Sequence, residues 1–350
     1  MEFQENVPLA PYTTFGIGGP ARWFAEARSE GDLVEAAAFA REAGLPLFAL
    51  GGGSNLLVSD QGYRGVVLRI ALAGIEEERR GSSLIFSVAA GEDWDAFVDH
   101  AVAKDCGGIE CLAGIPGTAG GTPVQNVGAY GQEVAQTIHM VRAFDQMQSD
   151  FVDLAPEQCG FSYRRSRFNS FDAGRFLVCR VDFSLEQGRA PSIEYEDLIR
   201  YFKEHNLSCT LGATSRAVRV IRKSKGMVIS PSDPDSRSAG SFFKNPIVAM
   251  GVYERIAAGF SPAPVPHYPA PADDTGRARV KLPAAWLLEK AGFHRGLIRG
   301  RAGISSRHTL ALINRGDALA ADILRLRDEI IAGVEEQFNV RLEAEPVWLE

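Results

Sequence analysis

The chain has 350 residues, of which 45% are hydrophobic and 23% charged, and its formal net charge is −7. This length allows two or three domains with sizeable cores. The negative charge, without a run of basic residues, argues against a nucleic-acid partner. No apolar run approaches the roughly 18 residues of a membrane span, and the first residues do not resemble a secretory signal. We therefore expect a cytoplasmic protein that does not bind membranes.

The first residues with a clear pattern are 29–43, which predict a helix. Ser29 and Asp32 fit a capping box at its start, and Gly44 fits its end. Short strands are expected next at 45–50, 56–60 and 66–70. Helix, strand, glycine-rich turn and strand together indicate an α/β unit.

The rest of the chain predicts a mixture of strands and helices. Strands are expected at 84–91, near 137–145 and near 176–185, and helices at 92–108, 194–205, 214–223 and 318–338. Thr214 is the expected N-cap of its helix, and residues 261–279 are expected to form an irregular loop or flap. In the last helix a core-facing stripe recurs at helical spacing: Ile323, Leu326, Ile330, Val334 and Phe338. A closing strand is expected at 340–350.

The five cysteines are an odd number in scattered positions, which predicts reduced thiols rather than a disulfide framework. The six histidines are scattered too, and neither a CxxC nor an HExxH spacing occurs. We therefore expect no metal site.

The segment "LGGGSNLLVSD" (50–60) lies between two predicted strands. A Rossmann GxGxxG motif needs a strand before it and a helix after it, so this segment is not one. Without side chains at its three glycines, backbone N–H groups can approach an anion, and Ser54 and Asn55 add donors. The alternative is a tight connection between strands, for which one glycine usually suffices. The pattern favours a site for a pyrophosphate.

A second glycine-rich segment, "CLAGIPGTAGGTPVQNVGAYGQE" (111–133), contains six glycines and almost no charge. Ile115, Val124, Val127 and Tyr130 recur at intervals that a disordered linker would not show. We interpret the segment as an ordered loop that binds a large, polar, ring-bearing ligand. Two such loops suggest a dinucleotide that spans two subdomains.

The third unusual segment, "RSAGSFFKNP" (237–246), contains a hydroxyl group, Ser241, directly before two phenylalanines, and a lysine and an amide directly after them. The phenylalanines indicate that the backbone enters an apolar interior, while the polar groups gather at one place. Such a place favours chemistry or ligand recognition. The alternative is a serine that only caps local backbone.

Seven motifs in this order resemble the UDP-N-acetylenolpyruvoylglucosamine reductase family, the flavoenzymes of peptidoglycan precursor synthesis. The resemblance extends from about Thr13 to Trp348. The motifs are "YTTFGIGGPA", "LGGGSNLLVSD", "GIPGTAGGTPVQNVGAYGQE", "FSYRRSRF", "AGSFFKNP", "AAWLLEKAG" and "LEAEPVW".

The fold that the resemblance implies is α+β. Residues 1–187 would form a two-subdomain FAD-binding module of the vanillyl-alcohol-oxidase (PCMH) type, with subdomains at about 1–70 and 71–187. Residues 188–350 would form an α+β substrate-binding domain, from which the last strand, about 340–350, returns to the active site.

The reaction that the resemblance implies is NADPH-dependent reduction of UDP-N-acetylglucosamine enolpyruvate to UDP-N-acetylmuramate. Hydride passes from FAD N5 to C3, and a serine gives a proton to C2. The FAD is expected to be non-covalent, because His100 and His139 both lie outside the first glycine loop. A monomer with only small-molecule partners is expected. The alternatives are another FAD oxidoreductase or oxidase with the same module, and a non-catalytic nucleotide-sugar binder.

The resemblance implies three catalytic residues. Arg164 would hold the substrate carboxylate and stabilise the enolate, with its neighbour Arg165 at the surface. Ser241 would give the proton to C2, and Glu345 would assist near the carboxylate. The choice of Glu345 over Glu343 rests on the resemblance alone, because alternate residues of a strand share one face.

The resemblance also implies binding residues. Those for the cofactor are Gly51, Gly52, Gly53, Ser54, Asn55, Leu56, Pro116, Gly117, Thr118, Gly121, Thr122, Asn126, Gly128, Ala129, Tyr130 and Arg222. Those for the substrate are Tyr195, Lys225, Asn245, Tyr268 and His308. The chain has extra residues between Lys225 and Ser241 and again after Tyr268, and the matched tyrosine at 195 places it with the subclass that has a tyrosine-bearing loop.

Overall fold

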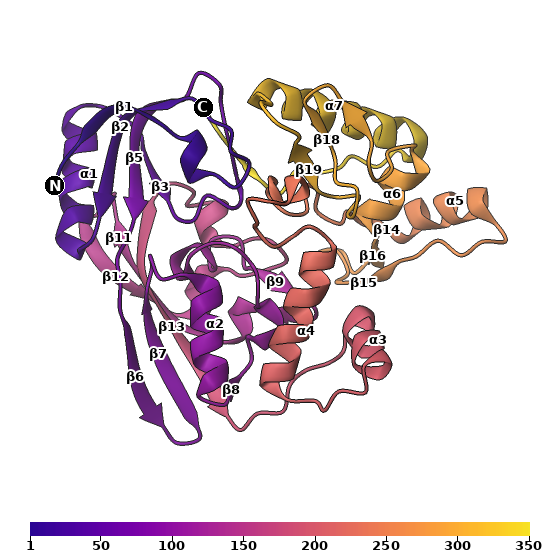
Figure 1. Cartoon of the computed structure of the whole chain (residues 1–350), viewed down its shortest axis with the longest axis horizontal. Helices are drawn as coiled ribbons and strands as arrows, with labels where there is room; N and C mark the ends of the chain where they lie inside the picture. Colours follow the sequence, from indigo (N-terminus) through magenta and orange to yellow (C-terminus); the bar gives the residue numbers. More distant parts are fainter.

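The computed structural model describes residues 1–350 and has an α+β fold (Figure 1). The first α/β unit forms a sheet with the order β1-β2-β5-β3, in which only β1 is antiparallel to its neighbour. Its strands are β1 (Gln4–Pro8), β2 (Pro20–Ala27), β3 (Leu47–Leu50) and β5 (Tyr63–Ile70). Helix α1 (Glu30–Glu42) begins at the predicted capping box, in which Ser29 and Asp32 each accept from the other's backbone N–H. The buried Leu33 of α1 belongs to the same apolar cluster as Leu68 of β5.

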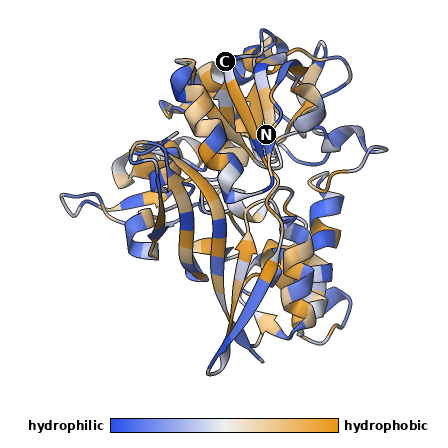
Figure 2. Cartoon of the chain, turned by 90° about the vertical axis from the view of Figure 1, so that its left-hand side faces the viewer, coloured by the Kyte–Doolittle hydropathy of each residue, from blue (hydrophilic) through white to orange (hydrophobic).

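The second sheet is antiparallel and has the order β12-β11-β13-β7-β6. Its strands are β6 (Ile75–Arg80), β7 (Ser83–Ala89), β11 (Ile138–Asp145), β12 (Asp150–Leu154) and β13 (Phe176–Gln187). Helix α2 (Trp94–Ala103) packs on it through Phe97, whose ring lies 5.6 Å from that of Phe86 and 5.1 Å from that of Phe183. The tip of the β6–β7 hairpin, at the bottom of Figures 1 and 2, is hydrophilic because it extends beyond this core.

A helix pair follows the second sheet: α3 (Glu196–Glu204) and α4 (Leu211–Ser224). Both come after the predicted domain boundary at 187. Nevertheless Leu198 of α3 and Val218 of α4 belong to the apolar cluster of the N-terminal part. The boundary stays a prediction, and the helix pair packs with the part that precedes it in the chain.

The C-terminal part contains two three-stranded sheets and three helices around a separate cluster of 27 buried apolar residues. The elements are β14 (Ile247–Ala249), β15 (Tyr268–Ala270), β16 (Arg279–Lys281), β17 (Ile298–Arg299), β18 (Ala302–Ile304), β19 (Leu312–Asn314), α5 (Met250–Phe260), α6 (Ala284–Lys290) and α7 (Ala320–Phe338). The stripe predicted for the last helix is buried at all five positions. No helix of the protein combines the length and the apolarity needed to cross a bilayer.

The end of the chain returns to the first sheet. Strand β20 (Val347–Leu349) pairs in parallel with β4 (Leu56–Val58), which directly follows the first glycine loop. Figure 1 shows the yellow C-terminal segment leaving the C-terminal part to reach the indigo N-terminal part. This pairing fixes residues just before 347 beside the glycine loop.

Three local predictions were wrong. Helix α4 begins at Leu211 and is capped by Thr210, whose Oγ1 accepts from Ala213 N; Thr214 is buried one turn further on. The segment 261–279 is not wholly irregular, because β15 pairs with β16 within the predicted flap. The closing strand is shorter than expected, because only its last residues find a partner strand.

The side chain of Asp60 links the two ends of the fold, since its oxygens accept from the N–H groups of Ala320 (2.7 Å) and Ala321 (3.1 Å) at the start of α7. We expect Asp60→Ala to lower the free energy of unfolding by about 1 kcal/mol, the usual value of a helix cap. Urea unfolding measures this, with the exposed Asp328→Ala as control. A loss no larger than in that control would show that the contact does not stabilise α7.

Candidate active site

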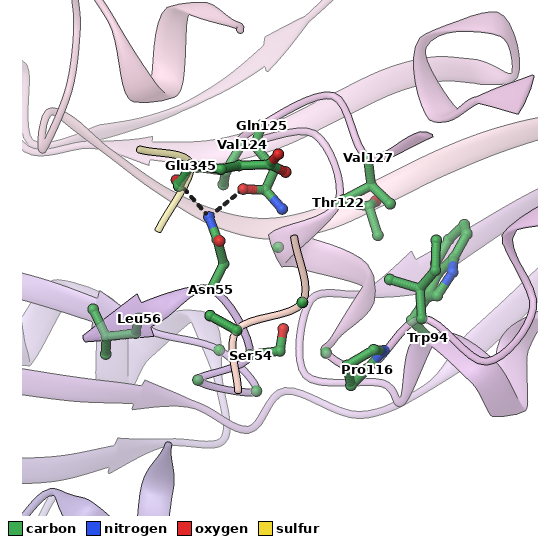
Figure 3. Close-up of a pocket in the computed structure, with 18 of the residues that line it drawn as sticks. Ser54, Asn55, Leu56, Trp94, Pro116, Thr122, Val124, Gln125, Val127 and Glu345 are labelled. Carbon is green, nitrogen blue, oxygen red and sulfur yellow. Dashed lines mark hydrogen bonds between the residues drawn. The ribbon is translucent and has the colours of Figure 1, made fainter. Parts of the chain in front are cut away.

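A cavity of about 290 Å³ lies where the two glycine loops meet the C-terminal part. It brings together all three predicted catalytic residues and most of the predicted cofactor residues. The residues concerned are Gly51, Gly52, Gly53, Ser54, Asn55, Leu56, Pro116, Gly117, Thr118, Gly121, Thr122, Gly128, Arg164, Arg222, Ser241 and Glu345. Figure 3 shows how the two loops approach each other across this cavity.

Each of the three consecutive glycines is needed for a different steric reason. A Cβ on Gly52 would lie 2.6 Å from Gly117 Cα, and one on Gly51 would lie 2.9 Å from Thr118 Oγ1. Gly53 has a positive φ of 62°, and a Cβ there would lie 1.9 Å from Tyr12 O. The alternative of a simple tight turn, which needs one glycine, does not account for this run.

The first glycine loop presents unpaired backbone donors. The N–H groups of residues 51–55 donate no hydrogen bond to another group of the protein. Successive free N–H groups in a glycine-rich turn form an anion-binding concavity. The guanidinium of Arg222 also lines the cavity, so the residues present fit the phosphates of a dinucleotide such as FAD.

Asn55 joins three segments that are far apart in the sequence. Its Nδ2 donates to Gln125 Oε1 of the second glycine loop and, at 3.2 Å, to the carbonyl oxygen of Glu345 (Figure 3). The backbone of Asn55 also accepts from Val347 N at 2.9 Å. One side chain and its backbone thus hold both loops and the returning chain end in register.

Arg164 has a backbone conformation that is unusual for a residue with a side chain. Its φ is +55°, and Asn169 Nδ2 donates to its carbonyl oxygen at 3.2 Å. The guanidinium donates to the carbonyl oxygens of Asn126 (3.4 Å) and Gly128 (2.5 Å) of the second loop. Strained backbone of this kind is concentrated at functional sites. The neighbouring Arg165 is exposed, as expected.

Arg164 and Glu345 form the charged pair of the cavity. Arg164 Nε lies 3.2 Å from Glu345 Oε1 but is not aligned for a hydrogen bond, so this buried N–H has no partner. Burial raises the pKa of Glu345, and the charges of Arg164 and Lys244 oppose that shift. A buried donor without a partner is rare in proteins, and here it belongs to a side chain that lines the cavity.

The two glutamates near the chain end differ in their surroundings. The side chain of Glu343 is 73% exposed and pairs with Lys244 at 2.5 Å, whereas Glu345 lines the cavity. Only an isolated bridge, at Ala344, is formed in this segment, and the expectation that the two side chains share one strand face stays a prediction. The structure therefore distinguishes two residues that the sequence pattern could not.

Ser241 lies beside Glu345 because two segments pair there. The carbonyl oxygen of Phe242 accepts from Glu345 N at 2.8 Å, and Lys244 N donates to Glu343 O at 3.0 Å. The rings of Phe242 and Phe243 are buried in the C-terminal core. The buried phenylalanines fix the backbone, so that Ser241 and Lys244 face the cavity.

Eight predicted residues do not line the cavity. Among the cofactor residues these are Asn126, Ala129 and Tyr130, and among the substrate residues Tyr195, Lys225, Asn245, Tyr268 and His308. Tyr195 contacts the ring of Tyr130 edge-on at 5.3 Å, and Lys225 pairs with Asp197 at 2.6 Å. Asn126 holds the second loop through Glu133 at 2.9 Å.

The remaining predicted residues lie around the C-terminal part. Asn245 Oδ1 accepts from Ala284 N at 2.9 Å, so this amide caps the start of α6. Tyr268 is exposed on β15. His308 contacts Ser241 from behind the cavity lining. Binding roles for these residues remain predictions.

Several lining residues were missed from the sequence. Trp94, Gln125, Asn169 and Lys244 line the cavity but were not predicted as site residues. Gln125 and Lys244 stand inside motifs that were recognised, so their polar side chains were an available signal. Trp94 begins α2 and Asn169 ends a 3₁₀ turn, and neither pattern distinguishes them from structural residues.

Two family models match the chain in consecutive regions. An FAD binding domain matches residues 21–150, and the C-terminal domain of UDP-N-acetylenolpyruvoylglucosamine reductase matches residues 232–349. These two regions supply the glycine loops and the segments around Ser241 and Glu345.

Whole-length relatives agree with these models. The UDP-N-acetylenolpyruvoylglucosamine reductase of Thermobifida fusca is 42% identical over 99% of this chain and 98% of its own. That of Streptomyces avermitilis is 44% identical over 98% of this chain and 93% of its own. The crystal structure of the Thermus caldophilus reductase covers 100% of both chains at 27% identity, with a TM-score of 0.67. The chain therefore belongs to the UDP-N-acetylenolpyruvoylglucosamine reductase family.

Proposed function

We propose that this reductase uses NADPH and a non-covalently bound FAD to convert UDP-N-acetylglucosamine enolpyruvate to UDP-N-acetylmuramate, as a cytoplasmic monomer. The observation that carries the proposal is the convergence of Arg164, Ser241 and Glu345 on the cavity that the glycine loops line. Arg164 suits a carboxylate, Ser241 can give a proton, and the glycine loops suit a dinucleotide.

The glycine loops are the proposed FAD site. The free N–H groups of residues 51–55 would bind the diphosphate, and the close approach of Gly52 to Gly117 leaves no side chain between the loops. When bound, the flavin supplies the chemistry of hydride transfer, from NADPH to C3 of the enolpyruvyl group. All other steps fall to side chains of the protein.

The proposed role of Arg164 is to stabilise negative charge. Addition of hydride to C3 leaves an electron pair that spreads over C2 and the adjacent carboxylate of the substrate. A guanidinium binds a carboxylate through two parallel N–H groups. Arg164 is already held in place by the carbonyl oxygens of Asn126 and Gly128, so little reorganisation is needed as the charge develops.

The proposed role of Ser241 is to give the proton to C2. Ser241 lines the same cavity as Arg164 and Glu345, and its backbone is fixed by the buried rings that follow it. The basic carbon of an enolate can take a proton from a weak acid that is held in position. Glu345, whose pKa is raised by burial, would assist near the substrate carboxylate.

Gly52→Ala tests the cofactor site. The added Cβ would lie 2.6 Å from Gly117 Cα and must move the loops apart. We expect FAD affinity to fall roughly tenfold or more, since each factor of ten corresponds to about 1.4 kcal/mol. Flavin absorbance per protein measures this, and circular dichroism checks the fold. Gly251→Ala, which meets no atom within 4 Å, is the control. Native FAD affinity in Gly52→Ala would count against this site.

Arg164→Lys tests the carboxylate site. Lysine keeps the charge but loses the planar pair of N–H groups. We expect reoxidation of the flavin by the enolpyruvyl substrate to slow roughly 10²-fold, while its reduction by NADPH stays near the native rate. Stopped-flow absorbance separates the two half-reactions, and the exposed Arg165→Lys is the matched control. Equal losses in both half-reactions would exclude a specific role toward the substrate carboxylate.

Ser241→Ala tests the proton donor. A positioned acid contributes roughly 10²–10⁴-fold, so reoxidation by the substrate should slow by that factor. Reduction by NADPH needs no proton from serine and should stay near native. The exposed Ser82→Ala is the control. If the alanine variant is reoxidised at the native rate, Ser241 only orders local backbone.

A further inference from the structure

The hydroxyl of Ser241 has one side-chain partner in the protein. Its Oγ lies 3.0 Å from Nε2 of His308, which approaches from the loop that precedes β19. His308 does not line the cavity itself. A substrate in the cavity would therefore meet Ser241, with His308 behind it.

The loop that carries His308 is held by a buried carboxylate from the chain insertion before Ser241. Asp235 Oδ2 accepts from Ser305 Oγ (2.9 Å) and from the N–H (3.0 Å) and hydroxyl (2.7 Å) of Ser306. Ser305 Oγ in turn accepts from His308 N at 3.3 Å. Hydrogen bonds to the loop that carries His308, including one from its own backbone N–H, thus fix the position of the imidazole.

A serine and a histidine in contact can serve two opposite chemistries. In a nucleophilic serine the histidine removes the proton and becomes positively charged, and a carboxylate bonded to the other ring nitrogen stabilises that charge. No carboxylate accepts a hydrogen bond from the ring of His308; its one side-chain contact of this kind is with Ser241. The arrangement therefore lacks the group that the nucleophilic chemistry needs.

The charges around the pair act in the same direction. Burial lowers the pKa of His308 to about 4, and the positive charges of Lys225, Arg222 and Arg295 add to this shift. These surroundings disfavour an imidazolium. Burial disfavours any charge on the pair, but the three positive charges favour a negative charge on Ser241 Oγ, which is the charge that forms when the serine gives its proton away.

We propose that His308 is a positioning residue for Ser241, whose neutral ring donates its Nε2–H to Ser241 Oγ. This inference rests on the proposed role of Ser241 as the acid. Because one lone pair of its oxygen accepts from His308, the serine hydroxyl is free to direct its own hydrogen into the cavity. The sequence resemblance implied a substrate-binding role for His308, and the geometry points to this one instead.

The proton step balances without a further reactant. The Ser241 O–H bond breaks, and its proton forms a C–H bond with the electron pair of the enolate at C2. The oxygen keeps the electron pair of the broken bond, and the Nε2–H of His308 stabilises it. A solvent proton restores the hydroxyl after the product has left.

Three variants of His308 test the donor atom. The amide nitrogen of glutamine can take the place of Nε2, whereas that of asparagine corresponds to Nδ1. For His308→Leu we expect reoxidation by the substrate to slow roughly 10²-fold, as for loss of one preorganised donor, with reduction by NADPH near native. His308→Gln should keep reoxidation within roughly tenfold of native, and His308→Asn should resemble His308→Leu. The exposed His139→Leu is the control. Native reoxidation in His308→Leu, or better function with Asn than with Gln, would overturn the inference.

A second measurement does not depend on turnover or on the leucine variant folding. Nitrogen-15 NMR of histidine-labelled holoenzyme should show His308 neutral at pH 7 with the hydrogen on Nε2. A hydrogen on Nδ1 alone would mean that Ser241 donates to the ring, and the inference would fail.

The double variant separates this inference from the proposed function. If His308 acts through the serine, Ser241→Ala with His308→Leu should be reoxidised no more slowly than Ser241→Ala alone. Native reoxidation in Ser241→Ala would overturn the proton-donor role itself. If reoxidation by the substrate is lost in Ser241→Ala but stays at the native rate in His308→Leu, only the role of the histidine is overturned.

Discussion

The backbone at Gly52 passes so close to the backbone at Gly117 that a methyl group on Gly52 would separate the two glycine loops. These loops come from different sheets, and Asn55 ties both to the chain end through Gln125 and Glu345. The cavity therefore exists only while three distant segments keep this register. The pairing of β20 with β4 maintains it, because each residue of the returning strand has a fixed partner beside the loop.

The polar groups that line the cavity lie at the boundary between two apolar cores. The cluster under the second sheet supports the second glycine loop, and the cluster of the C-terminal part supports Phe242 and Phe243. Rigid supports on both sides allow Arg164 to keep a left-handed backbone and an unpaired N–H. Strain and an unsatisfied donor of this kind persist only where the surrounding structure over-determines them.

Charge in the cavity is arranged around the reaction that the family carries out. Arg164, Arg222 and Lys244 line a cavity in which Glu345 is the one acidic side chain. Glu343 is 73% exposed and pairs with Lys244, so it offsets part of the positive charge that Lys244 brings to the cavity. Burial lowers the pKa of His308, and the positive charges of Lys225, Arg222 and Arg295 add to this shift. The proposed addition of hydride to the enolpyruvyl group would create negative charge on the substrate, which such a site would stabilise.

The sequence by itself determined the helix capped at Ser29, the apolar stripe of α7 and both glycine loops, because these follow from local rules of capping, periodicity and steric access. It also determined the family, through motifs spread over the chain. Only the tertiary structure decided between Glu343 and Glu345, joined Asn55 to Gln125, and placed His308 behind Ser241. Those relations join residues far apart in the chain, and their geometry depends on packing between elements, which no local pattern encodes.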